Sequence, residues 1–359
     1  MENKNITVVV GLSGGVDSSV AAFILKEQGY NVIGVTMKVC DPVKYPEAKK
    51  SACFGAGEEE DIEKAQQTAD LLGIPYHVID LSSQYESIVI DYFTAEYLGG
   101  KTPNPCIRCN ALVKFGLLPE MTRKSGIPFD FFATGHYVRV AFDEKTKRYL
   151  LKKAVFTKKD QSYFLSLLTQ DKLSNVIFPL GELTKEEVRD IARKAGLPSA
   201  EREESQDFYG GEISDLFKGK DASAGSIKTL DGKEIGKHTG IYNYTIGKRR
   251  GIGQTTGEKL YVVGIDSKTN TIIAGDEEQL YGNSLTVSNI NWIAIKDLTE
   301  KRECKVRIRY RHDEAEAVIT PLENNQVGVV FKERQKSITP GQYAVFYDGD
   351  VVLGGGVIE

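Results

Sequence analysis

The chain has few cysteines and no long apolar run. Only five of its 359 residues are cysteine, an odd number spread widely along the chain. A disulfide scaffold is therefore not expected, and metal-binding or catalytic roles for cysteine gain weight. No apolar run approaches the ~20 residues of a membrane span, and the N-terminal apolar run is too short for a signal peptide. We expect a cytoplasmic protein of two or three domains, at roughly 100–200 residues each, with no membrane partner.

An excess of positive charge is also missing. The formal net charge is −4 and the isoelectric point about 5.8, which is not the overall footprint of a strong nucleic-acid binder. Net charge does not exclude local patches, and two runs, 246–253 and 305–312, are rich in Lys and Arg. Lys248, Arg249 and Arg250 form a candidate phosphate-binding patch, although three adjacent cations are often only a solvated loop.

Two familiar phosphate-binding patterns are absent, since the chain contains neither G-x-x-x-x-G-K-[ST] nor G-x-G-x-x-G in the required context. What stands after the first apolar run, 6–11, is GLSGGVDSS at 11–19. A glycine loop between a strand and a helix offers backbone N–H groups and a helix N-terminus to an anion. A tight strand–helix turn with no ligand is the simpler alternative.

The hydrophobic pattern predicts an α/β fold. Apolar β-branched runs alternate with helical patterns through the first half of the chain, which indicates an open parallel sheet with ligands at the carboxyl ends of its strands. The predicted strands are 6–11, 31–39, 74–81 and 129–137, and the predicted helices are 18–29, 58–73, 85–100, 111–126, 161–173 and 184–196. Residues 205–283 are rich in turns, and 284–359 alternate as in a small β-barrel. We predict three domains at 1–204, 205–283 and 284–359.

Longer motifs carry a family resemblance. Ser13, Gly14, Gly15, Asp17 and Ser18 spell S-G-G-x-D-S, which resembles the pyrophosphate loop of ATP pyrophosphatases. TPNPCIRCNALVKFG, ATGHY, KDQSYFL, ESQDF, YTIGKRRGIG, RYRH and GQYAVFYDGDVVLGGGVI then occur in the order seen in tRNA-specific 2-thiouridylases. The resemblance covers nearly the whole chain. It implies an N-terminal domain of adenine-nucleotide alpha-hydrolase type, a small central domain, a C-terminal β-barrel, and replacement of the 2-oxygen of a tRNA wobble uridine by sulfur.

The resemblance also implies roles for individual residues. ATP would be held by Gly11, Leu12, Ser13, Gly14, Gly15, Val16, Asp17, Ser18, Met37 and Gly135, with Asp17 helping to place Mg²⁺. Contacts to tRNA would come from Asn104, Pro105, Cys106, His136, Lys159, Asp160, Gln161, Arg309, Tyr310 and Gln342. Several of them have a structural alternative: Met37 as a core residue, Gly135 as a tight turn, His136 as a hydrogen-bonded structural histidine, and 159–161 as a polar helix start.

The cysteines depart from the family pattern. Cys109 matches the catalytic cysteine that opens C-N-x-x-x-K-F, but a second cysteine, expected in ESQD-x-C-F, is replaced by Tyr209. A tyrosine cannot carry a persulfide. The chain instead has Cys106 in C-x-x-C, where better-known members have Asp, and also Cys53 and Cys40.

Several sulfur-handling arrangements fit these cysteines. Related tRNA thiolases hold an iron–sulfur cluster through three cysteines, so we predict a [4Fe-4S] cluster on Cys53, Cys106 and Cys109, with Cys40 as the alternative third ligand. A structural zinc, a Cys106/Cys109 redox pair that handles a persulfide, and unligated thiols remain open. Cys304 is expected to be an ordinary half-buried thiol. The sulfur donor is either a persulfide carrier protein or inorganic sulfide.

Two other functions share some of these features. An amide-forming ATP pyrophosphatase would have S-G-G-x-D-S but not the cysteine loop or the basic β-domain. A tRNA-binding protein without catalysis would not need an intact loop with Asp17 or an intact Cys109. Release of pyrophosphate from ATP that depends on tRNA separates the three.

Overall fold

The computed structural model describes residues 3–45, 52–55, 57–201, 207–220, 223–252 and 259–359. The described residues divide into two compact units, which are presented separately. Unit 1 comprises 1–88, 106–211 and 350–352, and unit 2 comprises 89–105, 212–349 and 353–359. The predicted domain boundary at 204/205 lies outside the described residues. Within the described part, no helix is both long and apolar enough to cross a membrane.

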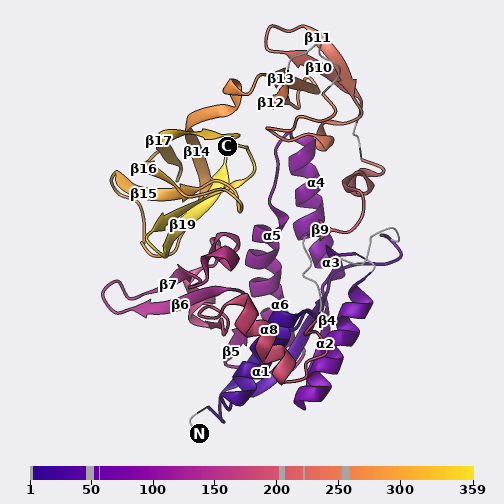
Figure 1. The fold of residues 1–359 in the computed structure, drawn as a ribbon, viewed down its shortest axis with the longest axis vertical. Coiled ribbons are helices and arrows are strands. Elements are labelled where there is room, and N and C mark those ends of the chain that lie inside the picture. The colour runs from indigo at the N-terminus through magenta and orange to yellow at the C-terminus, as the bar shows by residue number, and fades with distance from the viewer. Residues whose placement is uncertain (1–2, 46–51, 56, 202–206, 221–222, 253–258) are drawn as a thin grey trace. The chain divides into compact units, whose positions relative to one another are not determined.

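Unit 1 is built on a five-stranded parallel sheet in the order β4-β2-β1-β5-β8 (Figure 1). Its strands are β1 (Thr7–Gly11), β2 (Asn31–Lys38), β4 (Tyr76–Asp80), β5 (Phe131–Ala133) and β8 (Val176–Ile177). After β1, the chain adds β2 and β4 on one side of β1 and then β5 and β8 on the other side. The strand order therefore reverses between β1 and β5. Ligands of open α/β sheets bind at such a switch point, beyond the carboxyl ends of the strands.

The helices of unit 1 are α1 (Val16–Glu27), α2 (Glu58–Leu72), α3 (Ser82–Tyr85), α5 (Pro105–Arg108), α6 (Leu118–Lys124), α7 (Gln170–Ser174) and α8 (Lys185–Lys194). The unit also contains the hairpin of β6 (Val138–Asp143) and β7 (Arg148–Lys153), and the parallel pair of β3 (Ala52–Phe54) and β9 (Asp207–Tyr209). Neither pair is among the strands predicted from the sequence.

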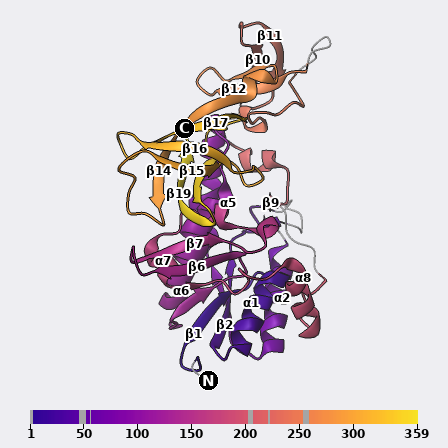
Figure 2. The same ribbon diagram turned by 60° about the vertical axis from the view of Figure 1, so that its left-hand side comes forward.

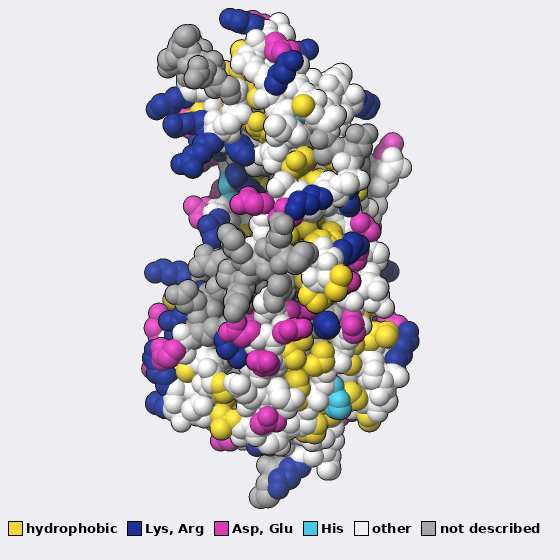
Figure 3. All heavy atoms as spheres, turned by 90° about the vertical axis from the view of Figure 1, so that its right-hand side faces the viewer, with side chains coloured by type: hydrophobic (Ala, Val, Ile, Leu, Met, Phe, Trp, Pro, Cys, Tyr) yellow, Lys and Arg dark blue, Asp and Glu magenta, His cyan; other side chains and the backbone are white. Residues whose placement is uncertain are grey.

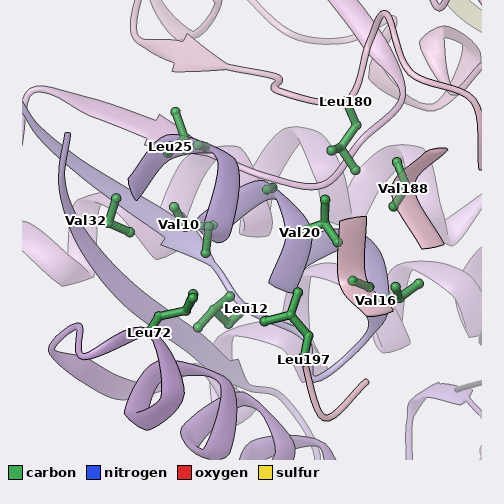
Figure 4. Close-up of a cluster of buried hydrophobic side chains, with 14 of the residues drawn as sticks. Val10, Leu12, Val16, Val20, Leu25, Val32, Leu72, Leu180, Val188 and Leu197 are labelled. Carbon is green, nitrogen blue, oxygen red and sulfur yellow. The ribbon is translucent and has the colours of Figure 1, made fainter. Parts of the chain in front are cut away.

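The core of unit 1 explains why α1 follows β1 so closely. Val10 and Leu12 from the first strand region pack with Val16, Val20 and Leu25, all of which are at most 3% exposed. Figure 4 shows these side chains pointing into one cluster with residues of α2 and α8. Burial of a Val or Leu side chain contributes about 1.5–3 kcal/mol, so the loop between β1 and α1 is anchored at both ends.

Unit 2 contains α4 (Asp91–Leu98) and two β-structures (Figure 2). A four-stranded sheet in the order β11-β10-β13-β12 is formed by β10 (Gly225–Thr229), β11 (Glu234–His238), β12 (Tyr261–Asp266) and β13 (Thr271–Gly275). Six further strands close through the β14–β19 pairing: β14 (Tyr281–Trp292), β15 (Arg302–Arg307), β16 (Ala315–Pro321), β17 (Val327–Lys336), β18 (Tyr343–Asp348) and β19 (Val351–Ile358). Closure leaves the barrel no open edge.

The predicted fold class is confirmed: an α/β parallel sheet, a small middle domain and a β-barrel are all present. The helix predicted at 161–173 is wrong. The chain there forms 3₁₀ turns at Thr157–Lys159 and Ser162–Leu165, followed by the short α7. The Asp160 carboxylate accepts hydrogen bonds from the backbone N–H groups of Ala154 and Ser162. Such side-chain bonds to the backbone compete with helical ones.

Two other predicted helices are interrupted by π-helical segments. Glu86–Ile90 is π-helical between α3 and α4, and Cys109–Leu117 is π-helical between α5 and α6. The predicted helix at 111–126 therefore begins earlier, and Cys109 is the first residue of the wider segment. Short π-helical segments inside helices frequently mark functional sites.

Candidate active site

The glycine loop joins β1 to α1 at the switch point of the sheet. Gly14 has a positive φ of 68°, a conformation in which a side chain is strained, and Gly15 precedes the first residue of α1. The Ser13 backbone N–H donates to Ser18 Oγ at 3.1 Å, and Ser18 Oγ donates to the Gly15 carbonyl at 3.1 Å. These bonds keep the loop folded over the helix N-terminus, an arrangement that suits a phosphate.

Neighbouring strands hold the loop in place. Thr36 on β2 donates its hydroxyl to the Leu12 carbonyl at 2.7 Å. After β5, Gly135 lies so close that an added Cβ would be 2.5 Å from the backbone carbon of Asp17 and 2.7 Å from the Ser18 nitrogen. Only glycine therefore fits there. Met37 stands near the carboxyl end of β2 and is partly exposed.

Asp17 has two partners that were not predicted from the sequence. Tyr137 donates its hydroxyl to Asp17 Oδ1 at 2.7 Å, and Lys185 Nζ lies 2.7 Å from the same oxygen. Lys185 is only 7% exposed, and a buried ammonium requires an anionic partner. It is the first residue of α8, where Thr184 and Glu187 form a capping box. That capping pattern, T-x-x-E, is visible in the sequence, but its proximity to Asp17 is not.

Three thiols lie close together in unit 1. Burial raises the pKa of Cys106 to about 12, with a further rise from the neighbouring Cys53 and Cys109. Burial also raises the pKa of Cys109 to about 11, although the Lys114 ammonium and a hydrogen bond from Tyr85 act to lower it. Both thiols are therefore protonated at neutral pH, while Cys53 is exposed.

Lys114 and Tyr85 are thus functional candidates that sequence reasoning missed. Lys114 follows Cys109 by five residues within the π-helical segment, whose hydrogen bonds span five residues. Tyr85 is 2% exposed, and its pKa is raised well above 10 by burial and then by all three thiols. The thiols of Cys109, Cys53 and Cys106 are therefore all near enough to the buried Tyr85 hydroxyl to raise its pKa.

Cys40 has different surroundings. Burial raises its pKa to about 12, and the carboxylates of Glu58 and Asp41 add to the rise. Glu58 accepts hydrogen bonds from the backbone nitrogens of Val39 and Cys40 at 2.6 Å and 3.1 Å. Cys40 therefore lies among carboxylates rather than among the thiols. Across the described residues, no three or more His, Cys, Asp or Glu side chains are arranged to hold a metal ion.

Three family models match the chain. A tRNA methyl transferase HUP domain covers residues 6–209, a tRNA methyl transferase PRC-barrel domain covers 217–276, and an aminomethyltransferase beta-barrel domain covers 282–358. The chain is 49% identical over 355 residues to the tRNA-specific 2-thiouridylase MnmA of Endomicrobium trichonymphae, covering 98% of each chain. The chain belongs to the tRNA-specific 2-thiouridylase family.

A second relative supports the same family, and one solved structure is reported beside it. MnmA 1 of Caldanaerobacter subterraneus subsp. tengcongensis is 48% identical over 364 residues, which are 99% of this chain and 98% of the relative. Among solved structures, a 4-thiouridine synthetase–RNA complex with bound ATP aligns with a TM-score of 0.34 and 15% identity, over 58% of this chain and 45% of that chain. The predicted resemblance to the 2-thiouridylase family is confirmed.

The tRNA contacts predicted for unit 1 of this 2-thiouridylase-family chain include two residues with internal bonds. Asp160 is 3% exposed and also accepts the Ser162 hydroxyl at 2.8 Å. Gln161 Oε1 accepts the backbone N–H of Tyr137 at 2.9 Å. These bonds fix the segment after β7, so Asp160 has a structural role here. Lys159 is partly exposed.

His136 directly follows Gly135, which packs against the backbone of Asp17 and Ser18. Its Nδ1 is 2.7 Å from Thr134 Oγ1, and its ring packs between Phe115 and Phe178. Burial, followed by the Lys114 charge, holds its pKa well below 6.5. The imidazole is therefore neutral at physiological pH, which allows it to accept or donate hydrogen bonds but not to attract phosphate by charge.

The predicted tRNA residues of unit 2 are in part brought together. Gln342 Nε2 donates to the Thr102 carbonyl at 2.7 Å, which places it beside the segment that continues into Asn104 and Pro105. Arg309 Nη2 donates to the Lys336 carbonyl at 2.8 Å on a different part of the barrel. Tyr310 is partly exposed.

The candidate phosphate patch at 248–250 is only partly available. Lys248 donates to the Asn243 carbonyl at 2.6 Å and lies over the Tyr244 ring, whereas Arg249 and Arg250 are exposed. On the face drawn in Figure 3, Lys and Arg side chains are interspersed with Asp and Glu over the lower part of the picture. The part of the surface seen there therefore carries both positive and negative side chains and is not uniformly positive.

Proposed function

We propose that the chain catalyses ATP-dependent 2-thiolation of the wobble uridine of tRNA. The observation that carries this proposal is the presence, in one compact unit of a 2-thiouridylase-family chain, of both a braced anion-binding loop with Asp17 and a group of thiols that includes Cys109. The loop suits activation of an oxygen by ATP, and the thiols suit delivery of sulfur. An enzyme that needs reduced thiols and tRNA fits a cytoplasmic location.

The first half-reaction is adenylation. The uridine 2-oxygen attacks the α-phosphate of ATP, the bond to pyrophosphate breaks, and the 2-oxygen becomes part of an AMP leaving group. The N–H groups of residues 11–15 would hold the phosphates, and Met37 and Gly135 would frame the nucleotide. Asp17 is partly exposed beside this loop, and carboxylates with phosphates are the usual ligands of Mg²⁺. Mg²⁺ bound there would offset phosphate charge.

Lys185 and Tyr137 prepare Asp17 for this role. Both bond to Oδ1, so they fix the rotamer of the carboxylate, and the ammonium compensates its charge before ATP arrives. A carboxylate positioned in advance does not have to be ordered during the reaction. These two residues act on orientation and charge, and do not themselves touch the uridine.

The second half-reaction displaces AMP by sulfur, with Cys109 as the central thiol. Lys114 and Tyr85 both favour its thiolate, against the opposing effect of burial. A thiol route through Cys106 and Cys109 is supported by their spacing of three residues at the junction of α5 and the π-helical segment. The disulfide left after one turnover would be reduced by a thiol reductant.

The predicted [4Fe-4S] cluster on Cys53, Cys106 and Cys109 stays a prediction. The three thiols are neighbours, but the described residues do not arrange them for a shared metal, and Cys40 is set apart among carboxylates. No step is therefore derived through a cluster. Iron content and a broad visible absorption band of anaerobically purified protein test this prediction directly.

The tRNA substrate would be contacted by residues of both units. Arg309, Tyr310 and Gln342 would contribute from the barrel, with Asn104 and Pro105 held beside Gln342. The predicted candidates in unit 1 are Cys106, His136, Lys159, Asp160 and Gln161, of which Asp160 also has a structural role. The sulfur would come from a persulfide carrier protein or from inorganic sulfide.

The decisive experiment measures pyrophosphate release and the nucleoside product together. Purified chain with ATP, Mg²⁺, a sulfur donor and unmodified tRNA should release pyrophosphate only when tRNA is present, and digestion should yield 2-thiouridine by mass spectrometry. Asp17→Asn is expected to lose both signals. Pyrophosphate release that requires an amino acid or ammonia instead of tRNA would indicate an amide-forming enzyme, and tRNA binding without release would indicate a non-catalytic binder.

A further inference from the structure

The three neighbouring thiols of unit 1 differ in their access to solvent. Cys53 is exposed, whereas Cys106 and Cys109 are only partly exposed and lie around the buried hydroxyl of Tyr85. A sulfur-carrying protein cannot enter a packed interior, so it must hand its sulfur to a thiol at the surface. Cys53 is the most exposed member of this group and so meets that requirement best.

Strand pairing places Cys53 next to the position of Tyr209. β3 and β9 run parallel, with Ala52 paired to Asp207 and Phe54 paired to Tyr209, and Cys53 lies between these two rungs. The two segments are more than one hundred and fifty residues apart in the chain. The strand that carries the exposed Cys53 is therefore paired with the strand that carries Tyr209, which occupies the place of the expected second cysteine.

Tyr209 has a packing role that explains its presence. It is 7% exposed, and its ring lies 6.0 Å from that of Phe54, which in turn stacks on Tyr85 with centroids 5.3 Å apart. An added Cβ on Gly211 would be 2.6 Å from the Tyr209 ring. The aromatic contacts join β9, β3 and the thiol-bearing region into one cluster, so the strand that carries Cys53 is fixed relative to Tyr85.

We propose that Cys53 is the residue that accepts sulfur from a persulfide donor and delivers it to the activated uridine, with Cys109 as its disulfide partner. This inference rests on the proposed function and assigns the thiol route to a different pair from Cys106 and Cys109. Cys106, three residues before Cys109, then serves as a neighbouring thiol that does not carry sulfur.

Sulfur passes from the donor through Cys53 to the uridine. The Cys53 thiolate attacks the outer sulfur of a donor persulfide, and the donor leaves as a thiolate, which gives a persulfide on Cys53. The terminal sulfur attacks C2 of the adenylated uridine, the bond from C2 to the AMP-bearing oxygen breaks, and AMP departs with the electron pair. Cys109 then loses its proton to solvent and attacks Cys53 Sγ. The sulfur–sulfur bond breaks, 2-thiouridine is released, and a thiol reductant supplies two electrons to reopen the Cys53–Cys109 disulfide.

The first experiment locates the sulfur. Purified chain is treated with glutathione persulfide, alkylated and digested, and each cysteine peptide is examined by mass spectrometry for one added sulfur atom. The expected result is a persulfide on Cys53 in the wild type and in Cys106→Ser, and none at this site in Cys53→Ser. A persulfide confined to Cys106 or Cys109 would overturn the proposal, as would iron bound through Cys53.

The second experiment separates this inference from the proposed function. Cys53→Ser should lose thiolation with glutathione persulfide by about 10³-fold or more, the scale of removing a covalent nucleophile, while tRNA-dependent pyrophosphate release persists. Inorganic sulfide, which needs no carrier thiol, should restore part of the thiolation. Cys304→Ser, on β15 of unit 2, is the matched control and should match the wild type.

Two results would contradict the inference in different ways. Full thiolation by Cys53→Ser from the persulfide donor would overturn the role of Cys53 and leave the proposed function standing. Absence of tRNA-dependent pyrophosphate release from the wild-type chain would overturn both. After a single turnover without reductant, a Cys53–Cys109 disulfide is expected in the peptide map, and a Cys106–Cys109 disulfide in its place would reject the assigned pair.

Discussion

The glycine loop and the cluster of three thiols (Cys53, Cys106 and Cys109), both in unit 1, are assembled in different ways. The loop is a continuous stretch between β1 and α1, and its internal bonds join residues within five positions of one another. The thiols of Cys53 and Cys109, and the Tyr85 hydroxyl near them, come from separate segments of the chain. Their arrangement depends on the pairing of β3 with β9. The shape of the contiguous loop depends on hydrogen bonds within the loop itself. The positions of the dispersed thiols depend on contacts between segments that are far apart in the chain.

The comparison predicts that the two sites can be damaged independently, and the largest effect is expected at the loop. Gly135→Ala would place a Cβ 2.5 Å from the Asp17 backbone carbon, so the loop must move. Adenylation, measured as tRNA-dependent pyrophosphate release, should fall about 100-fold, as misplacement by ~1 Å can cause. Persulfide labelling of Cys53 should not change.

A matched glycine provides the control for this substitution. At Gly328 an added Cβ meets only Leu322 side-chain atoms at 3.4–3.7 Å, which is ordinary contact. Gly328→Ala should therefore retain pyrophosphate release. Equal losses in the two variants would mean that Gly135 acts through general stability rather than through the loop.

An intermediate effect is expected at the buried cation of the loop region. Lys185→Met keeps the volume but leaves Asp17 without its ammonium partner at 2.7 Å. Loss of this partner should lower pyrophosphate release about tenfold, near the 1.4 kcal/mol that a tenfold change represents. Lys194→Met, at the exposed end of the same helix, is the control. If both variants release pyrophosphate at the wild-type rate, the ion pair does not position Asp17 for adenylation.

The smallest effect is expected from a substitution of Tyr85, beside the cluster of three thiols. Tyr85→Phe removes a hydrogen bond that lowers the pKa of Cys109. The pKa of Cys109 should therefore rise beyond about 11, and the fraction of thiolate at pH 8 should fall. Alkylation of Cys109 by iodoacetamide, followed by peptide mass spectrometry, should slow about threefold to tenfold, the scale of one hydrogen bond. In the wild type the rate should rise about tenfold per pH unit between 7 and 9, because both values lie below the pKa.

The control for this variant is Tyr97→Phe, at a partly buried tyrosine of unit 2 whose pKa is raised by burial alone. It should leave Cys109 alkylation unchanged. Faster alkylation in Tyr85→Phe would indicate that the ring shields the thiol and that its hydroxyl does not stabilise the thiolate.

Much of the fold could be predicted because its signals are local. β-branched runs, glycine at loop positions and the spacing of apolar residues gave the strands and helices around the first loop, and the barrel strands alternate clearly. The helix predicted at 161–173 is not formed as one continuous helix. Hydrogen bonds that the buried Asp160 carboxylate accepts from the backbone N–H groups of Ala154 and Ser162 compete with helical ones, and they depend on β7 being close by.

The features of the candidate site also separate into those encoded locally in the sequence and those that depend on tertiary contacts. The sequence alone determined that a glycine loop lies at 11–19 between a strand and a helix, that Cys109 is a candidate catalytic residue, and that Tyr209 cannot carry sulfur. Only the tertiary structure decided that Lys185 and Tyr137 hold Asp17, that Cys40 lies among carboxylates, and that the strand carrying Cys53 pairs with the strand carrying Tyr209. The physical reason is range: loop geometry and residue chemistry are encoded over a few residues, whereas burial, charge pairing and parallel strand contacts join segments that no local pattern connects.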